Sequence, residues 1–332
     1  MKKLRIGING FGRIGRRLFR LLHNHPEIVV VMINDVAPIS TLAHLLKYDS
    51  IHGIFSTNIS QEKENQLLVD DNPVLFSSEI EPATIPWDDA QVDLVVEASG
   101  KFRTNQMLQG HFNSEIKKVI LTVPPLDNTI KMVVLGVNDH ILDGSEKIIS
   151  NASCTTNNAA PMIKVVHDLC EVEQAYISTV HSFTTDQGLH DHPHPDLRRA
   201  RAAGQSIVPT TTGAAKALTR IFPDLSNVIG GCGIRVPVPN GSLTDMTINV
   251  KNKTSIEAIN NAFREVSAQS LKGILDYTEV PLVSVDIVGN QHSCIVDGQM
   301  TSVIGDLVKL IGWYDNESGY SARLIDLIKR IT

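Results

Sequence analysis

The sequence contains few cysteines and no long hydrophobic run, and each shortage excludes a class of protein. Its four cysteines, Cys154, Cys170, Cys232 and Cys294, are scattered through 332 residues. That pattern matches neither the disulfide framework of a small secreted domain nor the paired spacing of a metal site. No apolar stretch approaches the roughly 20 residues that span a bilayer, and the N-terminal residues form no signal-peptide core. We therefore expect a cytoplasmic protein with free thiols and no membrane partner.

Positive charge is also in short supply. The chain has 30 Lys and Arg residues against 36 Asp and Glu residues, which gives a formal net charge of −6. This balance disfavours nucleic acid as the primary partner, because proteins that bind it carry a basic surface. The composition, 42% hydrophobic and 20% charged, is ordinary for a globular protein, and the length indicates about two domains.

The first half of the chain alternates between strand and helix patterns. An apolar run at residues 3–9 precedes a helical spacing of apolar residues over 12–24, and a second apolar run follows at 28–33. Further strands are predicted at 93–97 and 118–122. This order favours a doubly wound, mostly parallel sheet of the Rossmann type.

The pattern changes after about residue 153. Long apolar or alternating runs predict strands at 175–185, 227–236, 243–250, 282–288 and 307–314. Helices are predicted at 155–169, 255–269 and 317–331, and residues 186–206 are predicted to form a long, ordered loop. The expected fold class is therefore α/β plus α+β, with a second domain built on a large, mostly antiparallel sheet. We place the first domain at residues 1–153 and 316–332, because the C-terminal helix is expected to return to it. The second domain is placed at residues 154–315.

A glycine-rich motif lies between the first predicted strand and helix. Residues 10–15 read Gly-Phe-Gly-Arg-Ile-Gly, which matches GxGxxG in the context that a dinucleotide site requires. Gly10 permits a tight turn, Gly12 lets the backbone approach a pyrophosphate, and Gly15 allows close packing of helix and strand. Asp35, 20 residues after Gly15, would accept hydrogen bonds from ribose hydroxyls and repel a 2′-phosphate. The motif therefore predicts NAD rather than NADP, the alternative being a purely structural turn.

A cysteine lies at the second strand-to-helix junction. Cys154 stands in Ser-Asn-Ala-Ser-Cys-Thr-Thr-Asn (150–157), where the helix N-terminus would stabilise a thiolate. His181, 27 residues later, ends an apolar run and could activate the thiol. The sequence alone leaves open whether the two side chains meet. The other three cysteines are interpreted as small buried hydrophobic residues.

Arginines and threonines gather in the second half. Arg198, Arg199 and Arg201 precede the hydroxyl-rich turn 210–213, and Arg235 lies in an apolar strand where an unpaired charge would be costly. Such residues converging on an open site suit small phosphate groups, although a basic run is usually a solvated face. The segment 190–194 (His-Asp-His-Pro-His) invites a metal interpretation. We expect no metal, because Pro193 is rigid and no cysteine or carboxylate framework surrounds the histidines.

These motifs together carry a family resemblance. The segments 8–16, 150–157, 196–203 (DLRRARAA), 209–217 (PTTTGAAKA) and 313–317 (WYDNE) resemble the phosphorylating glyceraldehyde-3-phosphate dehydrogenases. The resemblance covers essentially the whole chain.

The resemblance implies a role for each matching residue. Cys154 would attack the substrate aldehyde, and His181 would act as base, giving a hemithioacetal and then a thioacyl enzyme. Hydride would pass to NAD, and inorganic phosphate would release 1,3-bisphosphoglycerate, a step of glycolysis or gluconeogenesis. The substrate phosphate would be held by Thr184, Asp186, Arg199 and Arg235, and the attacking phosphate by Ser153, Thr155, Thr212 and Gly213, with Arg235 close to both. The NAD site would comprise Asn9, Phe11, Gly12, Arg13, Ile14, Asp35, Ser99, Thr122 and Asn316, with Pro193 from a neighbouring subunit of a homotetramer.

Two positions depart from the family pattern. Asn158 stands where the family usually has a second cysteine, so we expect activity to survive without cross-linking between these positions. Ser318 replaces the usual tryptophan in Asn-Glu-Trp-Gly (316–319), which removes packing where the last helix begins. The change could reduce NAD affinity or domain stability.

Two other functions remain open. An erythrose-4-phosphate dehydrogenase of the same superfamily is favoured by residues 194–197 and 205–207, whereas the threonine turn at 210–213 favours the phosphorylating enzyme. A catalytically silent NAD-binding or RNA-binding module is disfavoured by the negative net charge and by the presence of both Cys154 and His181.

Overall fold

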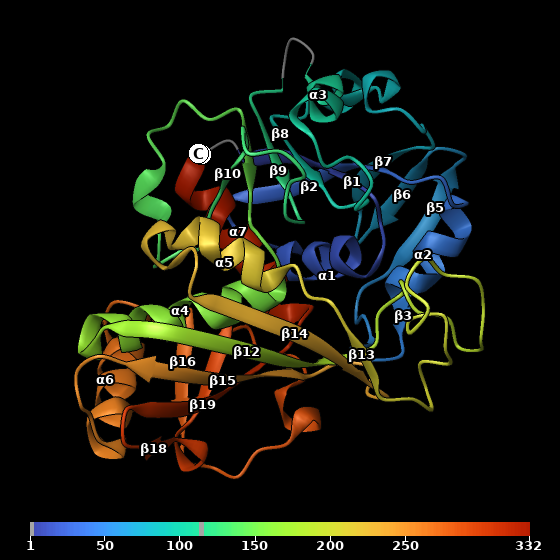
Figure 1. The fold of residues 1–332 in the computed structure, drawn as a ribbon. Helices are drawn as coiled ribbons and strands as arrows, with labels where there is room; N and C mark the ends of the chain where they lie inside the picture. The colour runs from blue at the N-terminus through green and yellow to red at the C-terminus, as the bar shows by residue number, and fades with distance from the viewer. Residues whose placement is uncertain (1–2, 113–115) are drawn as a thin grey trace. The chain divides into compact units, whose positions relative to one another are not determined.

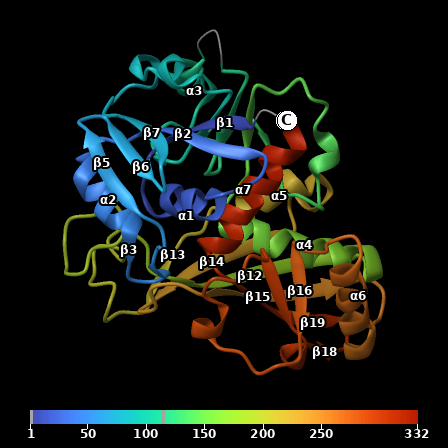
Figure 2. The same ribbon diagram turned by 180° about the vertical axis from the view of Figure 1, so that it is seen from behind.

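The chain divides into two compact units. The computed structural model describes residues 3–112 and 116–332. The first unit comprises residues 1–133, 140–152 and 324–332, and the second comprises 134–139 and 153–323. The chain therefore passes between the units more than once, and each unit is described by itself below (Figures 1 and 2).

The first unit is built on a nine-stranded sheet in which the central strands are parallel. Its strands, in spatial order, are β10 (Lys131–Met132), β11 (Ile148–Ser150), β9 (Lys118–Leu121), β8 (Leu94–Glu97), β1 (Leu4–Asn9), β2 (Ile28–Asn34), β7 (Asn72–Ser77), β6 (Gln66–Val69) and β5 (Ile59–Lys63). Only β5–β6 and β6–β7 pair antiparallel. From β1 the chain adds β2 and then β7 on one side, and it returns to the other side of β1 with β8. This topology is the predicted Rossmann-type doubly wound sheet, and β1 and β8 flank its switch point.

Helices and a two-stranded ribbon complete the first unit. The helices are α1 (Arg13–Leu22), α2 (Ile39–Lys47), α3 (Asn105–Leu108) and the end of α7 (Ser318–Ile331), and the ribbon is β3 (Tyr48–Asp49) with β4 (Gly53–Ile54). One core cluster includes Trp87, Val95, Leu108 and Val119, all at most 1% exposed. Trp87 lies directly on β1, because a Cβ on Gly7 would stand 2.5 Å from its ring.

The second unit is built on an eight-stranded, mostly antiparallel sheet. Its strands, in spatial order, are β13 (Val208–Thr210), β14 (Ile229–Val236), β12 (Val172–Ser182), β15 (Ser242–Val250), β19 (Leu307–Tyr314), β17 (Cys294–Asp297) and β16 (Leu275–Thr278), with β18 (Ser302–Ile304) also paired to β19. Only β12–β14 and β16–β17 are parallel. Along β15 buried residues alternate with half-exposed ones, as expected for a sheet with one covered face.

The covered face of that sheet carries three helices. They are α4 (Cys154–Cys170), α5 (Ala214–Ile221) and α6 (Ile256–Ala268). The long helix α4 packs on the central strands, α5 on β14 and α6 on β16 (Figure 1). Gly312 of β19 permits the close approach of α4, since a Cβ there would stand 2.7 Å from the sulfur of Met162.

The predicted elements agree with the structure except at one segment. The alternating residues 282–288 were expected to form a strand, and that prediction is wrong: Ser284–Ile287 is a single 3-10 turn. Val283 and Val285 are 57% and 71% exposed and Ile287 alone of this alternating set is buried, so the set does not share one covered face. The carboxylate of Asp286 accepts the Val283 N–H at 2.9 Å and closes the turn.

Candidate functional site

The carboxyl ends of β1, β2 and β8 form the edge where the first unit would bind a ligand. In open parallel sheets ligands bind at this edge, beside the switch point. Gly10 has a φ of +92°, and a Cβ there would stand 2.5 Å from the Ser99 backbone nitrogen. A Cβ on Gly15 would likewise stand 2.3 Å from the Gly10 carbonyl oxygen. The first and third glycines of the motif are therefore required by close packing.

The middle glycine leaves space for a ligand. Among the described residues other than Gly12 and its two chain neighbours, no atom lies within 4 Å of the position that a Cβ on Gly12 would occupy. Gly12 precedes α1 directly and has no side chain to cap that helix. An anion can therefore approach the backbone N–H groups at the helix N-terminus, which is the environment that a pyrophosphate requires.

Asp35 closes this edge from β2. Its Oδ2 accepts the Phe11 N–H at 2.7 Å and its Oδ1 accepts the Ala37 N–H at 2.9 Å. Phe11 itself is fully buried and packs edge-to-face on Phe19, so only its backbone can face a ligand. The carboxylate of Asp35 keeps further lone pairs for ribose hydroxyls. The residues present therefore fit a dinucleotide.

The other predicted NAD residues of this unit surround the same edge. Arg13 forms a bidentate ion pair with Asp49 at 2.7 and 3.1 Å. Thr122 donates its hydroxyl to the Glu97 carbonyl at 3.0 Å. Asn9, Ser99 and Ile14 complete the set at the ends of β1 and β8 and in the first turn of α1. The two remaining predicted residues, Pro193 and Asn316, belong to the second unit.

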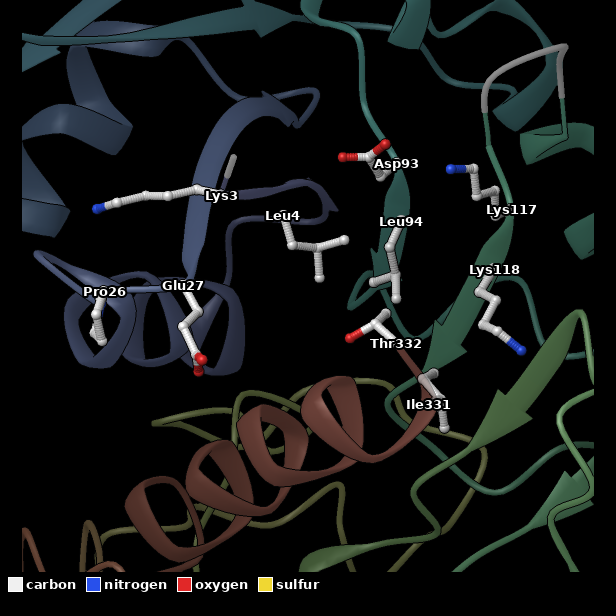
Figure 3. A pocket seen from close by; sticks show the side chains of 10 residues that line it. All are labelled: Lys3, Leu4, Pro26, Glu27, Asp93, Leu94, Lys117, Lys118, Ile331 and Thr332. Carbon is white, nitrogen blue, oxygen red and sulfur yellow. The ribbon is translucent and has the colours of Figure 1, made fainter. Parts of the chain in front are cut away.

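A hollow of about 1080 Å³ lies at the opposite edge of the same sheet. Its lining residues include Leu4, Leu94 and Lys118, which begin β1, β8 and β9 (Figure 3). The amines of Lys3 and Lys118 are bonded to backbone carbonyls, at 2.8 Å to His25 and at 2.9 Å to Glu146. Because this hollow is at the amino ends of the strands, its size does not make it the dinucleotide site.

In the second unit the structure brings Cys154 and His181 together. Cys154 is the first residue of α4, and His181 is the penultimate residue of β12. The Cys154 Sγ and His181 Nε2 atoms are 3.5 Å apart. The Ser153 hydroxyl caps the helix by accepting the Thr156 N–H at 3.1 Å, which fixes the turn that carries the cysteine.

Two opposed contacts meet at the other ring nitrogen of His181. Its Nδ1 lies 2.7 Å from the Ser182 carbonyl, which can only accept and therefore favours a proton on Nδ1. Arg235 Nη1, which can only donate, also lies against Nδ1 and favours the other tautomer, while it donates to the Ser182 carbonyl at 3.1 Å as well. In the neutral ring with the proton on Nδ1, the Nε2 lone pair is directed at the thiol.

The charges of this pair are controlled by burial. Burial raises the pKa of Cys154, while the positive charge of Arg235 and hydrogen bonds with Thr155 oppose the rise. Burial, followed by repulsion from Arg235, lowers the pKa of His181 to about 3, although its hydrogen bond to Ser182 acts in the opposite direction. Both shifts favour the uncharged forms, a thiol beside an imidazole, between which one proton can pass.

Arg199 is held by a closed set of polar contacts. Its Nη1 donates to Asp186 at 2.8 Å and its Nε to the Thr210 hydroxyl at 2.9 Å. That hydroxyl donates to Asp196 at 2.7 Å, and His194 Nε2 lies 3.4 Å from Asp186. Partial burial raises the pKa of Asp186, but hydrogen bonds with Arg199 and His194 outweigh it and lower the pKa overall. The guanidinium is thereby fixed at the base of the long loop.

The predicted anion-binding residues surround this cluster unevenly. Arg235 is half-buried and interacts electrostatically with both Cys154 and Arg199. Gly213 caps α5 without a side chain and is open on its Cβ side among the described residues, and the Thr212 hydroxyl accepts the Ala214 N–H at 3.2 Å. Thr184 follows β12 directly. Ser153 and Thr155 have structural partners as well, so their hydroxyls serve the fold in addition to any ligand.

Three residues that the sequence analysis missed support the site. The Tyr314 hydroxyl lies 2.9 Å from the Thr155 hydroxyl, and its ring meets His181 edge-on at 6.0 Å. The hydroxyls of Ser182 and Ser242 both donate to Asn316 Oδ1, at 2.9 and 3.0 Å. These donors fix the Asn316 amide with its N–H group turned away from them. No local sequence signal marks such residues, because their partners are 60 to 159 positions away.

The two departures from the family pattern are both buried. The Asn158 amide points at three backbone carbonyls, of Ser293, Gly312 and Trp313, at 3.3, 3.3 and 3.2 Å. Ser318 begins α7, and its N–H donates to the Asp315 carboxylate at 2.8 Å. Asn158 thus ties α4 to β19, and Asp315 caps the last helix where the tryptophan is absent.

Comparison with known proteins covers both units. Two sequence profiles match: "Glyceraldehyde 3-phosphate dehydrogenase, NAD binding domain" over residues 4–105, and "Glyceraldehyde 3-phosphate dehydrogenase, C-terminal domain" over residues 153–316. A glyceraldehyde-3-phosphate dehydrogenase of Mycobacterium avium is 48% identical over 331 residues, which are 98% of this chain and 97% of the relative. Glyceraldehyde-3-phosphate dehydrogenase 2 of Bacillus subtilis is 46% identical over 99% of this chain and 97% of its own length.

Proposed function

Since this chain belongs to the glyceraldehyde-3-phosphate dehydrogenase family, we propose that it oxidises and phosphorylates D-glyceraldehyde 3-phosphate through a covalent intermediate on Cys154. The chain is an NAD-dependent oxidoreductase by its family. The observation that carries the covalent mechanism is the 3.5 Å approach of the Cys154 thiol to His181 Nε2 at the N-terminus of α4.

The first step is addition of the thiol to the aldehyde. The Nε2 lone pair of His181 takes the thiol proton as the sulfur–carbon bond forms, and the ring then passes this proton to the former carbonyl oxygen, which becomes the hydroxyl of a hemithioacetal. The helix N-terminus and Arg235 favour the transient thiolate. His181 then accepts the proton of that hydroxyl as the carbon loses its hydride.

NAD, when bound, supplies the acceptor for that hydride. The chain's own residues hold it: Gly12 would admit the pyrophosphate and Asp35 the ribose hydroxyls. Asn316 is assigned to the nicotinamide carboxamide by the family resemblance. The N–H side of its amide, which the bonds from Ser182 and Ser242 turn away from these two serines, supports that assignment.

The remaining step is attack of inorganic phosphate on the thioacyl enzyme. Phosphate oxygen replaces sulfur at the acyl carbon, which releases 1,3-bisphosphoglycerate and restores Cys154. Ser153, Thr155, Thr212 and Gly213 would bind this phosphate, and Arg235 would lie close to it and to the substrate phosphate. Arg199, Asp186 and Thr184 would frame the substrate phosphate. The fixed guanidinium of Arg199 supports this division.

We also propose that the protein is a homotetramer of the cytoplasm. Leu189, Leu197 and Ile207 on the long loop are 74%, 82% and 70% exposed, which suits a segment buried against a neighbouring subunit. Pro193 on the same loop would then reach the neighbour's NAD site. Among the described residues, no helix has the length and apolar character to cross a bilayer. Residues 1–153 with 316–332 would form the NAD-binding domain, and 154–315 the catalytic and tetramerisation domain.

The test measures NADH absorbance with glyceraldehyde 3-phosphate, with and without inorganic phosphate. We expect multiple turnovers only with phosphate, and a single burst of about one NADH per subunit without it. The Cys154→Ala variant should form no NADH and should still bind NAD. Steady turnover without phosphate, or faster turnover on erythrose 4-phosphate, would transfer the assignment to a tetrose dehydrogenase.

A further inference from the structure

A buried carboxylate lies at the switch point of the first unit, and the proposed chemistry does not use it. Glu97 ends β8 and is fully buried. A buried carboxylate is costly unless donors surround it. Within residues 3–112 and 116–332 the side chain receives hydrogen bonds from Asn9, His111 and Ser99. The question is what this concentration of donors achieves.

The first chain of donors reaches Glu97 through two asparagines. The Glu79 N–H and the Ser77 hydroxyl both donate to Asn34 Oδ1 at 2.8 Å. Asn34 Nδ2 donates to Asn9 Oδ1 at 2.8 Å, and Asn9 Nδ2 donates to Glu97 Oε2 at 2.5 Å. Asn34 Nδ2 also donates to the Glu79 carbonyl at 2.9 Å. Each amide has only one orientation that satisfies both neighbours, so the donors that link Asn34 to Asn9 and Asn9 to Glu97 point toward the carboxylate.

The second chain of donors reaches the same oxygen through an imidazole. The Trp87 indole, which can only donate, gives its hydrogen to His111 Nδ1 at 3.3 Å. His111 Nε2 must therefore carry the ring proton, and it lies 2.9 Å from Glu97 Oε2. Trp87 and His111 are each 1% exposed. The indole thus selects the tautomer in which the imidazole supports the carboxylate.

The other carboxylate oxygen holds the loop that follows β8. Glu97 Oε1 accepts the backbone N–H of Ser99 at 2.8 Å and its hydroxyl at 2.5 Å. The Ser99 backbone is the surface on which Gly10 rests. Through Asn9 and Ser99, one carboxylate therefore holds both segments that form the dinucleotide edge.

We propose that Glu97 and His111 are positioning residues for NAD. The carboxylate holds the β1 turn and the β8 loop in register, and His111 keeps the carboxylate in place. Neither residue touches the cofactor. The inference rests on the part of the proposed function that places NAD at this edge.

A purely structural role would make a different prediction. If the network only stabilised the core, NAD affinity would follow stability in every variant. If it positions the edge, variants of the network would lose affinity out of proportion to stability. Val119 provides the comparison, because it is fully buried in the same core as Trp87 and bonds to no member of the network through its side chain.

The experiment uses the full-length protein and titrates NAD by calorimetry at 25 °C. Glu97→Gln retains the volume of the side chain but replaces one acceptor by an N–H donor, which faces donors already in place. We expect its Kd for NAD to rise at least tenfold. Val119→Ala should bind NAD within twofold of the native protein. Its thermal midpoint should nevertheless fall by at least as much as that of Glu97→Gln.

A second variant keeps the proposal testable if Glu97→Gln fails to fold. Trp87→Phe removes the indole donor together with part of a buried ring, so His111 is free to adopt the Nδ1–H form, and Val119→Ala again provides the comparison for lost packing. We expect its ¹⁵N ring shifts to move away from those of the Nε2–H tautomer, and the Kd for NAD to rise about threefold.

The outcomes separate the two proposals. If the native protein does not bind NAD, the proposed function fails. If the native protein binds and the network variants match it within twofold, or if Val119→Ala loses affinity equally, only the positioning role is overturned.

Discussion

Replacing Asn158 by aspartate should destabilise the second unit in a way that grows with pH. The side chain is fully buried, and its amide N–H groups face three carbonyls at 3.2–3.3 Å. Aspartate has the same shape but, when ionised, no donor. Its carboxylate would face three carbonyl oxygens with no cation among the contacts of Asn158, so the carboxyl should stay protonated in the folded protein.

The magnitude follows from the shift that this environment imposes. If the folded pKa is above 7 against about 3.9 in the unfolded chain, ionisation disfavours folding by about 4 kcal/mol at pH 7. Because the folded pKa is raised, this penalty is absent below pH 4 and increases by about 1.4 kcal/mol per pH unit above it. At low pH the protonated carboxyl of the Asn158→Asp variant still has one donor in place of the two N–H donors of the amide, and this loss lowers the free energy of unfolding by about 1 kcal/mol.

Alanine at the same position separates donor loss from charge. Asn158→Ala loses two hydrogen bonds, about 2 kcal/mol, but also removes Oδ1, which has no partner within the described residues. We expect a net loss of about 1–2 kcal/mol that is independent of pH. Asn158→Cys, the residue usual in the family, should behave in the same way.

The assay is urea unfolding followed by intrinsic fluorescence at pH 4.5, 5.5 and 7.0. Asn227→Asp is the control, because it introduces the same charge at an exposed position of the same unit. The reasoning is refuted if Asn158→Asp equals Asn158→Ala in stability at pH 7, or if its deficit does not change with pH.

Two further predictions concern the glycine-rich turn and the histidine. Gly10→Ala should lower the free energy of unfolding by about 3 kcal/mol and prevent NAD binding, since its Cβ would stand 2.5 Å from the Ser99 nitrogen at a φ of +92°. Gly12→Ala should fold normally but bind NAD poorly. Calorimetry that found the same NAD affinity for Gly12→Ala and the native protein would contradict this. Because the pKa of His181 is lowered to about 3, its contribution to stability is complete above pH 6.5 and is lost as the pH falls toward 3, by up to about 1.4 kcal/mol per unit. His181→Gln should have a flatter profile between pH 7.5 and 5.0 in thermal unfolding, and an unchanged slope would exclude His181 as the titrating group.

Local signals in the sequence were sufficient for the glycine-rich turn and for most helices and strands. Glycine spacing and hydrophobic period are properties of neighbouring residues, so β1, α1 and α4 follow from them directly. Residues 282–288 show where this reasoning fails. Their alternation predicts a strand, but the Asp286 carboxylate accepts the Val283 N–H and closes a turn, which leaves Val283 and Val285 exposed and buries Ile287.

The polar supports of both candidate sites could not be predicted in this way. Glu97 is 88 residues from Asn9 in the sequence, and Thr155 is 159 residues from Tyr314. From the amino-acid sequence alone, each of these side chains has several possible partners. Only the packing of distant strands selects one partner, which is why the residues that hold a site are harder to predict than those that form its surface.

The division of the chain sets the order in which the protein can be completed during synthesis. The first unit includes residues 324–332, among them the fully buried Leu324, Leu327 and Ile328. About 170 residues of the second unit separate them from Ala152. At about 5–20 residues per second, a ribosome needs roughly ten to thirty seconds to cover that distance. Throughout that interval the nascent first unit lacks its final helical segment and exposes the apolar surface which that segment will cover.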